Sequence, residues 1–313
     1  MVYVGIDLGG TGIKAGVVDE HGKILSRVEC PTHLERGHEA VIEDMAKLAL
    51  AAIEASGHTL ADVPSIGCGI PGIGLPDGMV PFCTNLGWHN VPLRALMQKV
   101  IDKPILIDND ATVAGLAESV AGVSRGAANS VFLTLGTGLG GGIVIGGKVY
   151  SGSHNIGSEL GHMVVMIDGE LCTCGNHGCW ERYASGTALI NQGRAAAHAH
   201  PESAIVKAVS GDLDKIEART VIDAAKAGDE VAMAVFDRYC FYLSAGINTI
   251  INAIDPEIVA LGGGVSHAGQ FLLDGVRKHV SEHLFYRTMP YARIELAVLG
   301  NDAGIIGAAM LGK

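Results

Sequence analysis

The sequence contains no run of 18 apolar residues, so we expect no transmembrane helix. An apolar strand begins at Val2 without a basic leader segment before it, and we therefore expect a cytoplasmic protein. Basic residues are scarce, because 22 Lys and Arg stand against 33 Asp and Glu, which gives a formal net charge of −11. This balance argues against nucleic acid or an anionic membrane surface as a partner.

Low charge excludes a further class of protein. Only 18% of the 313 residues are charged, and 48% are hydrophobic. Such a chain is not disordered, and its length is sufficient for two domains. No low-complexity linker separates them, and we expect the boundary near residue 120. An anionic substrate stays compatible with the net charge, because a few donors can create a local anion site.

The seven cysteines include no C-x-x-C motif, the usual spacing of a redox pair. Three of them, Cys172, Cys174 and Cys179, form C-x-C-x4-C beside His162 and His177. Thiolate and imidazole suit zinc, and a structural zinc ion takes four such ligands. The pattern predicts a site of three cysteines and one histidine; three buried free cysteines are the alternative. Spacing leaves the histidine open, since His162 would tie the loop to a distant strand and His177 would close it on itself.

Two stretches of the chain share one pattern of strand, glycine-rich corner, strand, glycine-lysine turn and strand. The first covers residues 2–29 and the second residues 129–150. The repetition suggests an internal duplication. Backbone N–H groups at the two corners, residues 7–11 and 134–138, can surround phosphates. For either corner alone, the alternative is an ordinary hairpin turn that needs positive φ.

Residues 136–141 also match the G-x-G-x-x-G dinucleotide fingerprint. That motif requires a helix directly after the turn, whereas the residues that follow here read as a strand. We reject the fingerprint. Helical patterns occur elsewhere, over residues 40–55, 93–100, 111–121, 187–199, 220–227, 230–254, 269–282 and 303–311.

Four motifs together resemble the ROK family of sugar kinases, in particular its bacterial glucokinases, over nearly the whole chain. They are DLGGTGIKAGVVD, DNDATVAGLAE, LTLGTGLGGGIV and ELGHMVVMIDGELCTCGNHGCWERYASG. The resemblance implies an α/β fold with two actin-like (ribonuclease H-like) domains around a central cleft. We expect residues 1–118 with residues 300–313 to form the first domain, and residues 119–299 to form the second, with the zinc loop.

The resemblance implies ATP-dependent phosphorylation of a hexose at the 6-hydroxyl with Mg²⁺, glucose being the expected substrate. A kinase for N-acetylglucosamine or N-acetylmannosamine is the alternative within this class, and some relatives use polyphosphate as the donor. A sugar-sensing regulator without a DNA-binding domain is a remote alternative. Relatives are commonly dimers, which predicts a homodimer.

The family's general base matches Asp110, which would take the proton of the sugar hydroxyl. By sequence alone, Asp110 is equally a helix N-cap, and the two roles are compatible. The backbone of the PGIG loop, residues 71–74, is expected to line the sugar. The hexose-binding residues implied by the resemblance are Asn85, Asn109, Asp110, Glu159, His162 and Glu181.

The implied zinc ligands are His162, Cys172, Cys174 and Cys179, which settles the histidine in favour of His162. The zinc ion would be structural and would hold Glu181 and His162 in place. The implied nucleotide-binding residues are Asp7, Gly9, Gly10, Thr11, Lys14, Thr137, Gly138, Gly263 and Gly264. Among these, Asp7 would act on Mg²⁺ through water, and Lys14 is as compatible with a solvated strand edge as with a phosphate contact.

Overall fold

The computed structural model describes residues 1–313 and divides into two compact units. Unit 1 comprises residues 1–132, 142–158 and 298–313, and unit 2 comprises residues 133–141 and 159–297. The domains expected from the sequence, residues 1–118 with 300–313 and residues 119–299, stay a prediction. No helix combines the length and the apolar character that crossing a membrane requires.

A five-stranded sheet forms the centre of unit 1, in the order β3-β2-β1-β4-β7. The first three strands form an antiparallel meander, and β4 and β7 continue from β1 in parallel. The short turns between the first strands favour antiparallel neighbours, whereas the parallel strands require longer connections. The bounds are β1 Val2–Leu8, β2 Gly12–Asp19, β3 Ile24–Pro31, β4 Ile66–Ile70 and β7 Ile105–Asn109.

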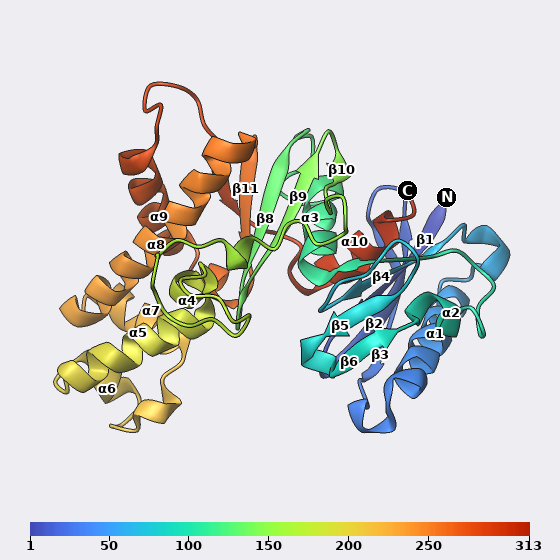
Figure 1. The fold of residues 1–313 in the computed structure, drawn as a ribbon, viewed down its shortest axis with the longest axis horizontal. Helices are drawn as coiled ribbons and strands as arrows, with labels where there is room; N and C mark the ends of the chain where they lie inside the picture. Colours follow the sequence, from blue (N-terminus) through green and yellow to red (C-terminus); the bar gives the residue numbers. More distant parts are fainter. The chain divides into compact units, whose positions relative to one another are not determined.

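Helices cover both faces of this sheet (Figure 1). Alternate strand residues such as Val4 and Ile6 pack against α1 (His38–Ala55) and α2 (Leu93–Met97). Tyr3, which precedes Val4 and points to the opposite face, lies in a second core with α3 (Asp110–Val120) and α10 (Ala303–Met310). The period-two alternation of the strands therefore supplies two cores, one for each helical layer.

Glycines allow the backbone of α10 to approach the sheet closely. A Cβ atom at Gly5 would overlap the carbonyl oxygen of Ile305, and one at Gly67 would overlap that of Ala308. A Cβ atom at Gly307 would overlap the carbonyl oxygen of Val113 in α3. Glycine at these positions is thus required by the packing of α10 between the sheet and α3.

The second sheet has the order β10-β9-β8-β11-β12, which repeats the order of the first. In both sheets a three-stranded meander comes first, and the two later strands are added beside its first strand, β1 or β8. The strands β11 and β12 are parallel to each other. The repeated order agrees with the duplication predicted from the glycine-cornered stretches. The bounds are β8 Ser130–Leu135, β9 Leu139–Ile145, β10 Lys148–Val149, β11 Ile258–Gly262 and β12 Arg293–Leu296.

Helices make up most of unit 2, and α8 is the longest of them (Figure 1). Asp229 caps its N-terminus by accepting a hydrogen bond from the Ala232 N–H at 2.9 Å. Its C-cap residue Asp255 has the left-handed conformation and directly precedes Pro256. The bounds are α4 Glu181–Ala184, α5 Gly186–Ala199, α6 Ala204–Ala208, α7 Ala218–Lys226, α8 Glu230–Ile254 and α9 Gln270–His283.

Some elements lie outside the patterns described in the sequence. A small hairpin of β5 (Val80–Cys83) and β6 (Trp88–Val91) occupies a region that neither the two repeated stretches nor the helical patterns cover. The last strand ends at Leu296, although the apolar run extends to Leu299. The strand stops there because the N–H groups of Val298 and Leu299 donate to the buried Glu118 carboxylate, each at 2.9 Å, instead of to a neighbouring strand.

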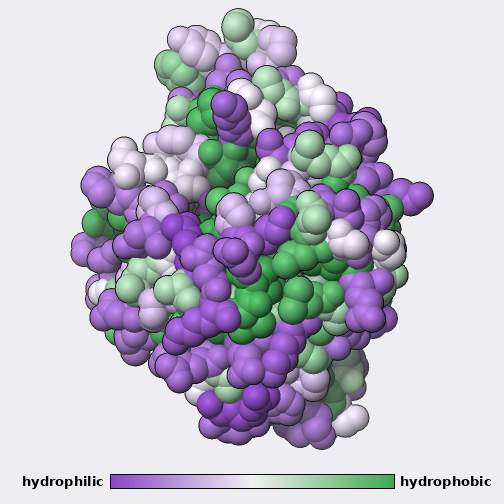
Figure 2. All heavy atoms as spheres, turned by 90° about the vertical axis from the view of Figure 1, so that its right-hand side faces the viewer, coloured by the Kyte–Doolittle hydropathy of each residue, from purple (hydrophilic) through white to green (hydrophobic).

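Figure 2 views the face on which α1 and α2 lie, and hydrophobic residues gather along its middle between hydrophilic ones. A shallow pocket of about 320 Å³ lies in unit 1, lined by Cys30, Pro31, His33, Asp44, Lys47, Leu48 and Ala51. Its acid and its lysine already have partners, since Asp44 pairs with Arg36 and Lys47 with Glu43, each at 2.6 Å. None of the predicted site residues lines this pocket.

Candidate active site and metal centre

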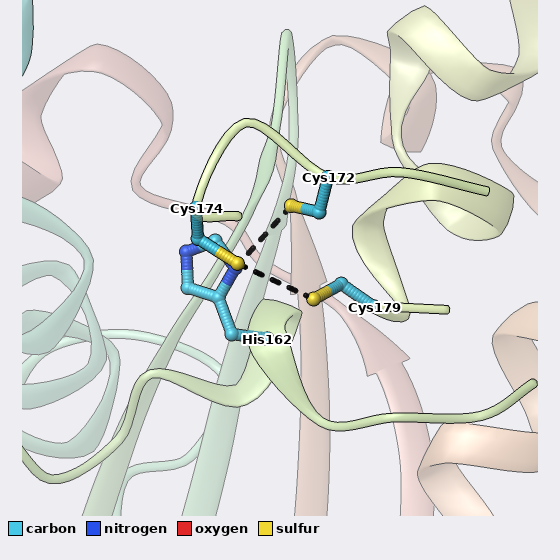
Figure 3. Close-up of side chains that lie close together, drawn as sticks. All are labelled: His162, Cys172, Cys174 and Cys179. Carbon is cyan, nitrogen blue, oxygen red and sulfur yellow. Dashed lines mark hydrogen bonds between the residues drawn. The ribbon is translucent and has the colours of Figure 1, made fainter. Parts of the chain in front are cut away.

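His162, Cys172, Cys174 and Cys179 lie together in unit 2 (Figure 3). Their ligand atoms all lie within 4.8 Å of one another. The Cys172 Sγ atom is 3.8 Å from His162 Nδ1, and the Cys174 and Cys179 Sγ atoms are 3.6 Å apart. His177 lies outside the cluster, because its Nδ1 atom is 2.8 Å from the Gly169 carbonyl oxygen. Three thiols and one imidazole at this spacing fit a tetrahedral structural zinc ion.

The loop that carries the cysteines is anchored by Trp180. This side chain is fully buried, and its Nε1 donates to the Tyr242 carbonyl oxygen in α8 at 2.8 Å. A Cβ atom at Gly246 would overlap the indole ring, so the glycine provides the space for it. The Trp180 N–H also donates to the Met163 carbonyl oxygen at 2.8 Å, which joins the loop to the segment that carries His162. The ligands therefore come from two segments held together independently of a metal.

The thiols of the cluster differ in acidity. Burial, together with the neighbouring thiols, raises the pKa of Cys179 to about 12. In contrast, a hydrogen bond from the Asn176 backbone lowers the pKa of the exposed Cys174. A bound metal cation would lower the pKa of the buried thiols and so offset the effect of burial, because a coordinating thiol is deprotonated.

Glu159, His162 and Glu181, all predicted to bind the hexose, also gather in unit 2. The Glu181 Oε1 atom is 3.1 Å from Cys172 Sγ and 3.9 Å from His162 Nδ1. Glu159 precedes the short helix Leu160–His162, and its carbonyl oxygen accepts the His162 N–H at 3.1 Å. Glu159 is solvent-accessible, yet desolvation raises its pKa; His162 opposes this shift, and the Glu181 charge adds to it.

In unit 1, the end of β7 leads directly into α3. Asn109 is the N-cap of this helix, and its Oδ1 accepts the N–H groups of Ala111 at 2.9 Å and Thr112 at 3.3 Å. The cap is thus one residue before Asp110, to which the sequence analysis had also given this role. Asp110 is the first residue of α3 and is exposed. The Asn109 cap fixes its position, and the Asp110 carboxylate itself accepts the N–H of Ala111 at 2.8 Å.

The PGIG loop and Asn85 belong to the same part of unit 1. The Asn109 Nδ2 donates to the Gly72 carbonyl oxygen at 3.3 Å, and Cys83 Sγ donates to that of Pro71 at 3.1 Å. Burial raises the pKa of Cys83 to about 11, and the negative charge of Asp110 contributes to this shift. Asn85, two residues after Cys83, is exposed. The hydrogen bonds therefore join the loop, the hairpin and the start of α3.

The glycine corner between β1 and β2 is also in unit 1. Its Gly9 N–H donates to the Gly12 carbonyl oxygen at 2.9 Å. Asp7, at the end of β1, has its Oδ2 3.7 Å from Lys14 Nζ. Burial raises the pKa of Asp7, and the Lys14 charge opposes that rise. Lys14 is thus a partner of Asp7 and not a wholly solvated side chain.

Two glycine-rich turns adjoin in unit 2. The Gly136 N–H donates to the Gly138 carbonyl oxygen at 3.0 Å, with the exposed Thr137 between them. Gly263 follows β11 with φ of 82°, and a Cβ atom there would overlap the Leu135 backbone. A Cβ atom at Gly264 would meet no neighbour. The corner at residues 136–138 and the turn after β11 therefore lie side by side.

A family model described as the ROK family matches residues 3–313. The chain belongs to the ROK family. Among curated relatives, a glucokinase of Thermotoga maritima is 38% identical over 99% of this chain and 96% of its own length. A glucokinase of Halalkalibacterium halodurans is 35% identical over 99% of this chain and 94% of its own length.

A solved ROK structure is also similar to this chain. The ROK glucokinase of Streptomyces griseus, in complex with glucose and AMPPNP, is 37% identical, with a TM-score of 0.82 and 99% coverage of each chain. The predicted family and the two-domain actin-like α/β fold are thereby confirmed.

Two polar residues near the candidate base were not singled out from the sequence. Ser151 Oγ donates to Asp108 Oδ2 at 2.8 Å, and Asn155 Nδ2 donates to the Gly74 carbonyl oxygen at 3.0 Å. They are 43 and 81 positions from their partners. No spacing pattern in the sequence relates them to these partners.

Proposed function

We propose that the protein is an ATP-dependent glucokinase, which transfers the γ-phosphoryl group of ATP to the 6-hydroxyl of glucose. The observation that carries the proposal is the likeness, at 37% identity over 99% of the chain, to a ROK glucokinase solved with glucose and AMPPNP. The likeness to two curated glucokinases over nearly their full lengths supports it. The arrangement of the side chains in each unit supports the individual roles that follow.

Asp110 would act as the general base in unit 1. Its carboxylate is exposed at the first residue of α3, where it can accept the proton of a sugar hydroxyl as the phosphoryl group is transferred. Asn109 and Asn85 would offer amide donors and acceptors to the neighbouring hydroxyls. The hydrogen bond from Asn109 to the Gly72 carbonyl oxygen supports this placement, because it fixes the amide beside the PGIG loop.

In unit 2, Glu159, His162 and Glu181 would bind the hexose hydroxyls. His162 would also be a zinc ligand, with Cys172, Cys174 and Cys179, and its Nδ1 atom lies 3.8 Å from Cys172 Sγ. A bound zinc ion would supply a crosslink between the segment of His162 and the cysteine loop, with no open position for chemistry. The 3.1 Å approach of Glu181 to Cys172 supports a role for this crosslink in positioning the carboxylate.

The glycine corners would bind the nucleotide. Neither Gly10 nor Gly136 has positive φ, and a Cβ atom at either would meet no protein atom. Neither backbone conformation nor packing explains glycine there, whereas the close approach of a phosphate group does. We assign phosphate contacts to Gly9, Gly10, Thr11 and Lys14 in unit 1 and to Thr137 and Gly138 in unit 2. Gly263 and Gly264 would adjoin the adenosine.

Mg²⁺ would accompany ATP and neutralise phosphate charge when bound. Asp7 offers the oxygen ligand that this cation prefers, and it would hold the ion through water. The 3.7 Å distance to Lys14 would keep the carboxylate ionised and oriented. We also propose a homodimer. Exposed apolar side chains in unit 2, including Phe285 (74% exposed) and Met289 (59% exposed), support an association surface there.

The function can be tested by a coupled assay of phosphoryl transfer with ATP and Mg²⁺. The panel is glucose, mannose, N-acetylglucosamine, N-acetylmannosamine and a control without sugar. We expect kcat/KM to be highest for glucose. A preference for an N-acetyl sugar would replace the substrate assignment and leave the kinase assignment in place. No turnover of any sugar, with ATP or with polyphosphate, would contradict the kinase.

The zinc assignment predicts the effect of Cys174→Ser. We expect the variant to lose its bound zinc, measured by mass spectrometry of the metal, and its KM for glucose to rise by about tenfold or more. Cys30→Ser is the matched control, because Cys30 lies in unit 1 outside the cluster. Full zinc content and an unchanged KM for glucose in Cys174→Ser would refute the role of the metal.

A further inference from the structure

The segment from Tyr150 to Ser158, here named the 150–158 loop, has a closed shape. The Gly157 N–H donates to the Ser151 carbonyl oxygen at 2.8 Å, and Ser158 Oγ donates to the Tyr150 carbonyl oxygen at 2.8 Å. Two of its non-glycine residues have positive φ, Asn155 at 54° and Ser158 at 69°. Residues rarely adopt this conformation unless surrounding contacts impose it. The loop therefore has a defined geometry that its hydrogen bonds maintain.

Two side chains dock the loop onto the rest of unit 1. The Ser151 hydroxyl donates to Asp108 Oδ2 at 2.8 Å, at the end of β7. The Asn155 amide donates to the Gly74 carbonyl oxygen at 3.0 Å, in the PGIG loop. The loop thus contacts both structures that the proposed function places beside the sugar, namely the strand that leads into Asp110 and the PGIG loop.

Asp108 connects Ser151 to the proposed base. Its Oδ1 accepts the Asn109 N–H at 2.8 Å, while its Oδ2 accepts the Ser151 hydroxyl. Burial raises the pKa of Asp108, and the two donors oppose this rise. A partly buried carboxylate is oriented by its donors, and here each oxygen has one. Loss of the Ser151 hydroxyl would free the carboxylate to turn away from Asn109, the cap on which the position of Asp110 depends.

We propose that Ser151 and Asn155 are positioning residues for phosphoryl transfer. Ser151 acts through Asp108 on the Asn109–Asp110 pair, and Asn155 acts on the PGIG loop through the Gly74 carbonyl group. Neither residue touches the reacting atoms. The inference rests on the proposed function, because it assigns these residues to the sugar site of a hexose kinase.

Ser151 and Asn155 predict different kinetic effects. In Ser151→Ala, misorientation of the base should lower kcat for glucose by about tenfold to a hundredfold, with the KM for ATP unchanged. Ser151→Thr retains the hydroxyl and should recover most of the lost kcat. Asn155→Gly tolerates positive φ but lacks the amide donor, so it should raise the KM for glucose roughly fivefold and change kcat little. The matched control is Ser153→Ala, at an exposed position in the same loop.

Steady-state kinetics of these four variants and the wild type, with thermal unfolding of each, test the proposal. The expected result is a fall of kcat in Ser151→Ala, recovery in Ser151→Thr and a rise of KM in Asn155→Gly. Ser151→Ala and Asn155→Gly indistinguishable from Ser153→Ala would overturn the inference alone. Equal losses for glucose and ATP with a lower melting temperature would indicate a fold defect and also overturn it. A wild type inactive on every hexose would instead remove the proposed function, and the inference with it.

Discussion

Replacing Asp110 with asparagine is expected to lower kcat for glucose phosphorylation by about 10²- to 10⁴-fold, the contribution of a general base. Asparagine matches the size of aspartate but cannot accept the proton of the hydroxyl. The variant should fold, because Asn109 and not Asp110 supplies the N-cap of α3. Binding of glucose should be retained, since the amide still offers a donor and an acceptor to the sugar.

The measurement is kcat in the coupled assay, with glucose affinity determined by calorimetry on the same preparation. Asp223→Asn is the control for the same chemical change, because Asp223 lies in an exposed pair with Arg219 on α7. Wild-type kcat in Asp110→Asn would refute the base assignment. Loss of glucose binding together with a lower melting temperature would point to damage to α3 instead.

Gly67→Ala is expected to destabilise unit 1 by about 3 kcal/mol or more. A Cβ atom there would overlap the Ala308 carbonyl oxygen, which belongs to the buried helix α10. Because the obstructing atom is backbone, no rotamer change can relieve the overlap, and α10 must move away from β4. The displaced helix would lose its packing against β1 and α3 as well.

Urea unfolding, with hydrogen exchange resolved to peptides of β4 and α10, measures this effect. Gly12→Ala is the matched control, since a Cβ atom at Gly12 would lie 3.7 Å from the Cys30 carbonyl oxygen, an ordinary contact. We expect faster exchange in α10 of Gly67→Ala and only a small change in Gly12→Ala. Equal stability of the two variants would contradict the close packing of α10.

Local patterns accounted for much of what the sequence could predict. The meander of β1 to β3 follows from short glycine turns between apolar runs, and its second copy was recognisable by the same pattern. The gathering of Cys172, Cys174 and Cys179 was expected, because eight consecutive residues contain all three. In contrast, the choice of His162 over His177 required the family resemblance, since spacing allowed both.

Contacts between distant residues were beyond the reach of sequence patterns. Glu118 reads as one polar residue of a helix, yet its carboxylate accepts the N–H groups of Val298 and Leu299, about 180 positions away. The bonds of Ser151 and Asn155 are of the same kind. The β5–β6 hairpin was missed for another reason, because its strands of four residues lie among glycine, proline and asparagine, which favour turns.

The position of α10 has a consequence for protein synthesis. This helix completes one of the two cores of unit 1, between the sheet and α3. Its residues, 303–310, leave the ribosome only after residues 159–297 of unit 2 have been made. The strands of unit 1 and α3 must therefore wait without α10 while unit 2 is made. During this interval the core around Tyr3 is incomplete, and its apolar residues would be a target for a chaperone that binds apolar segments.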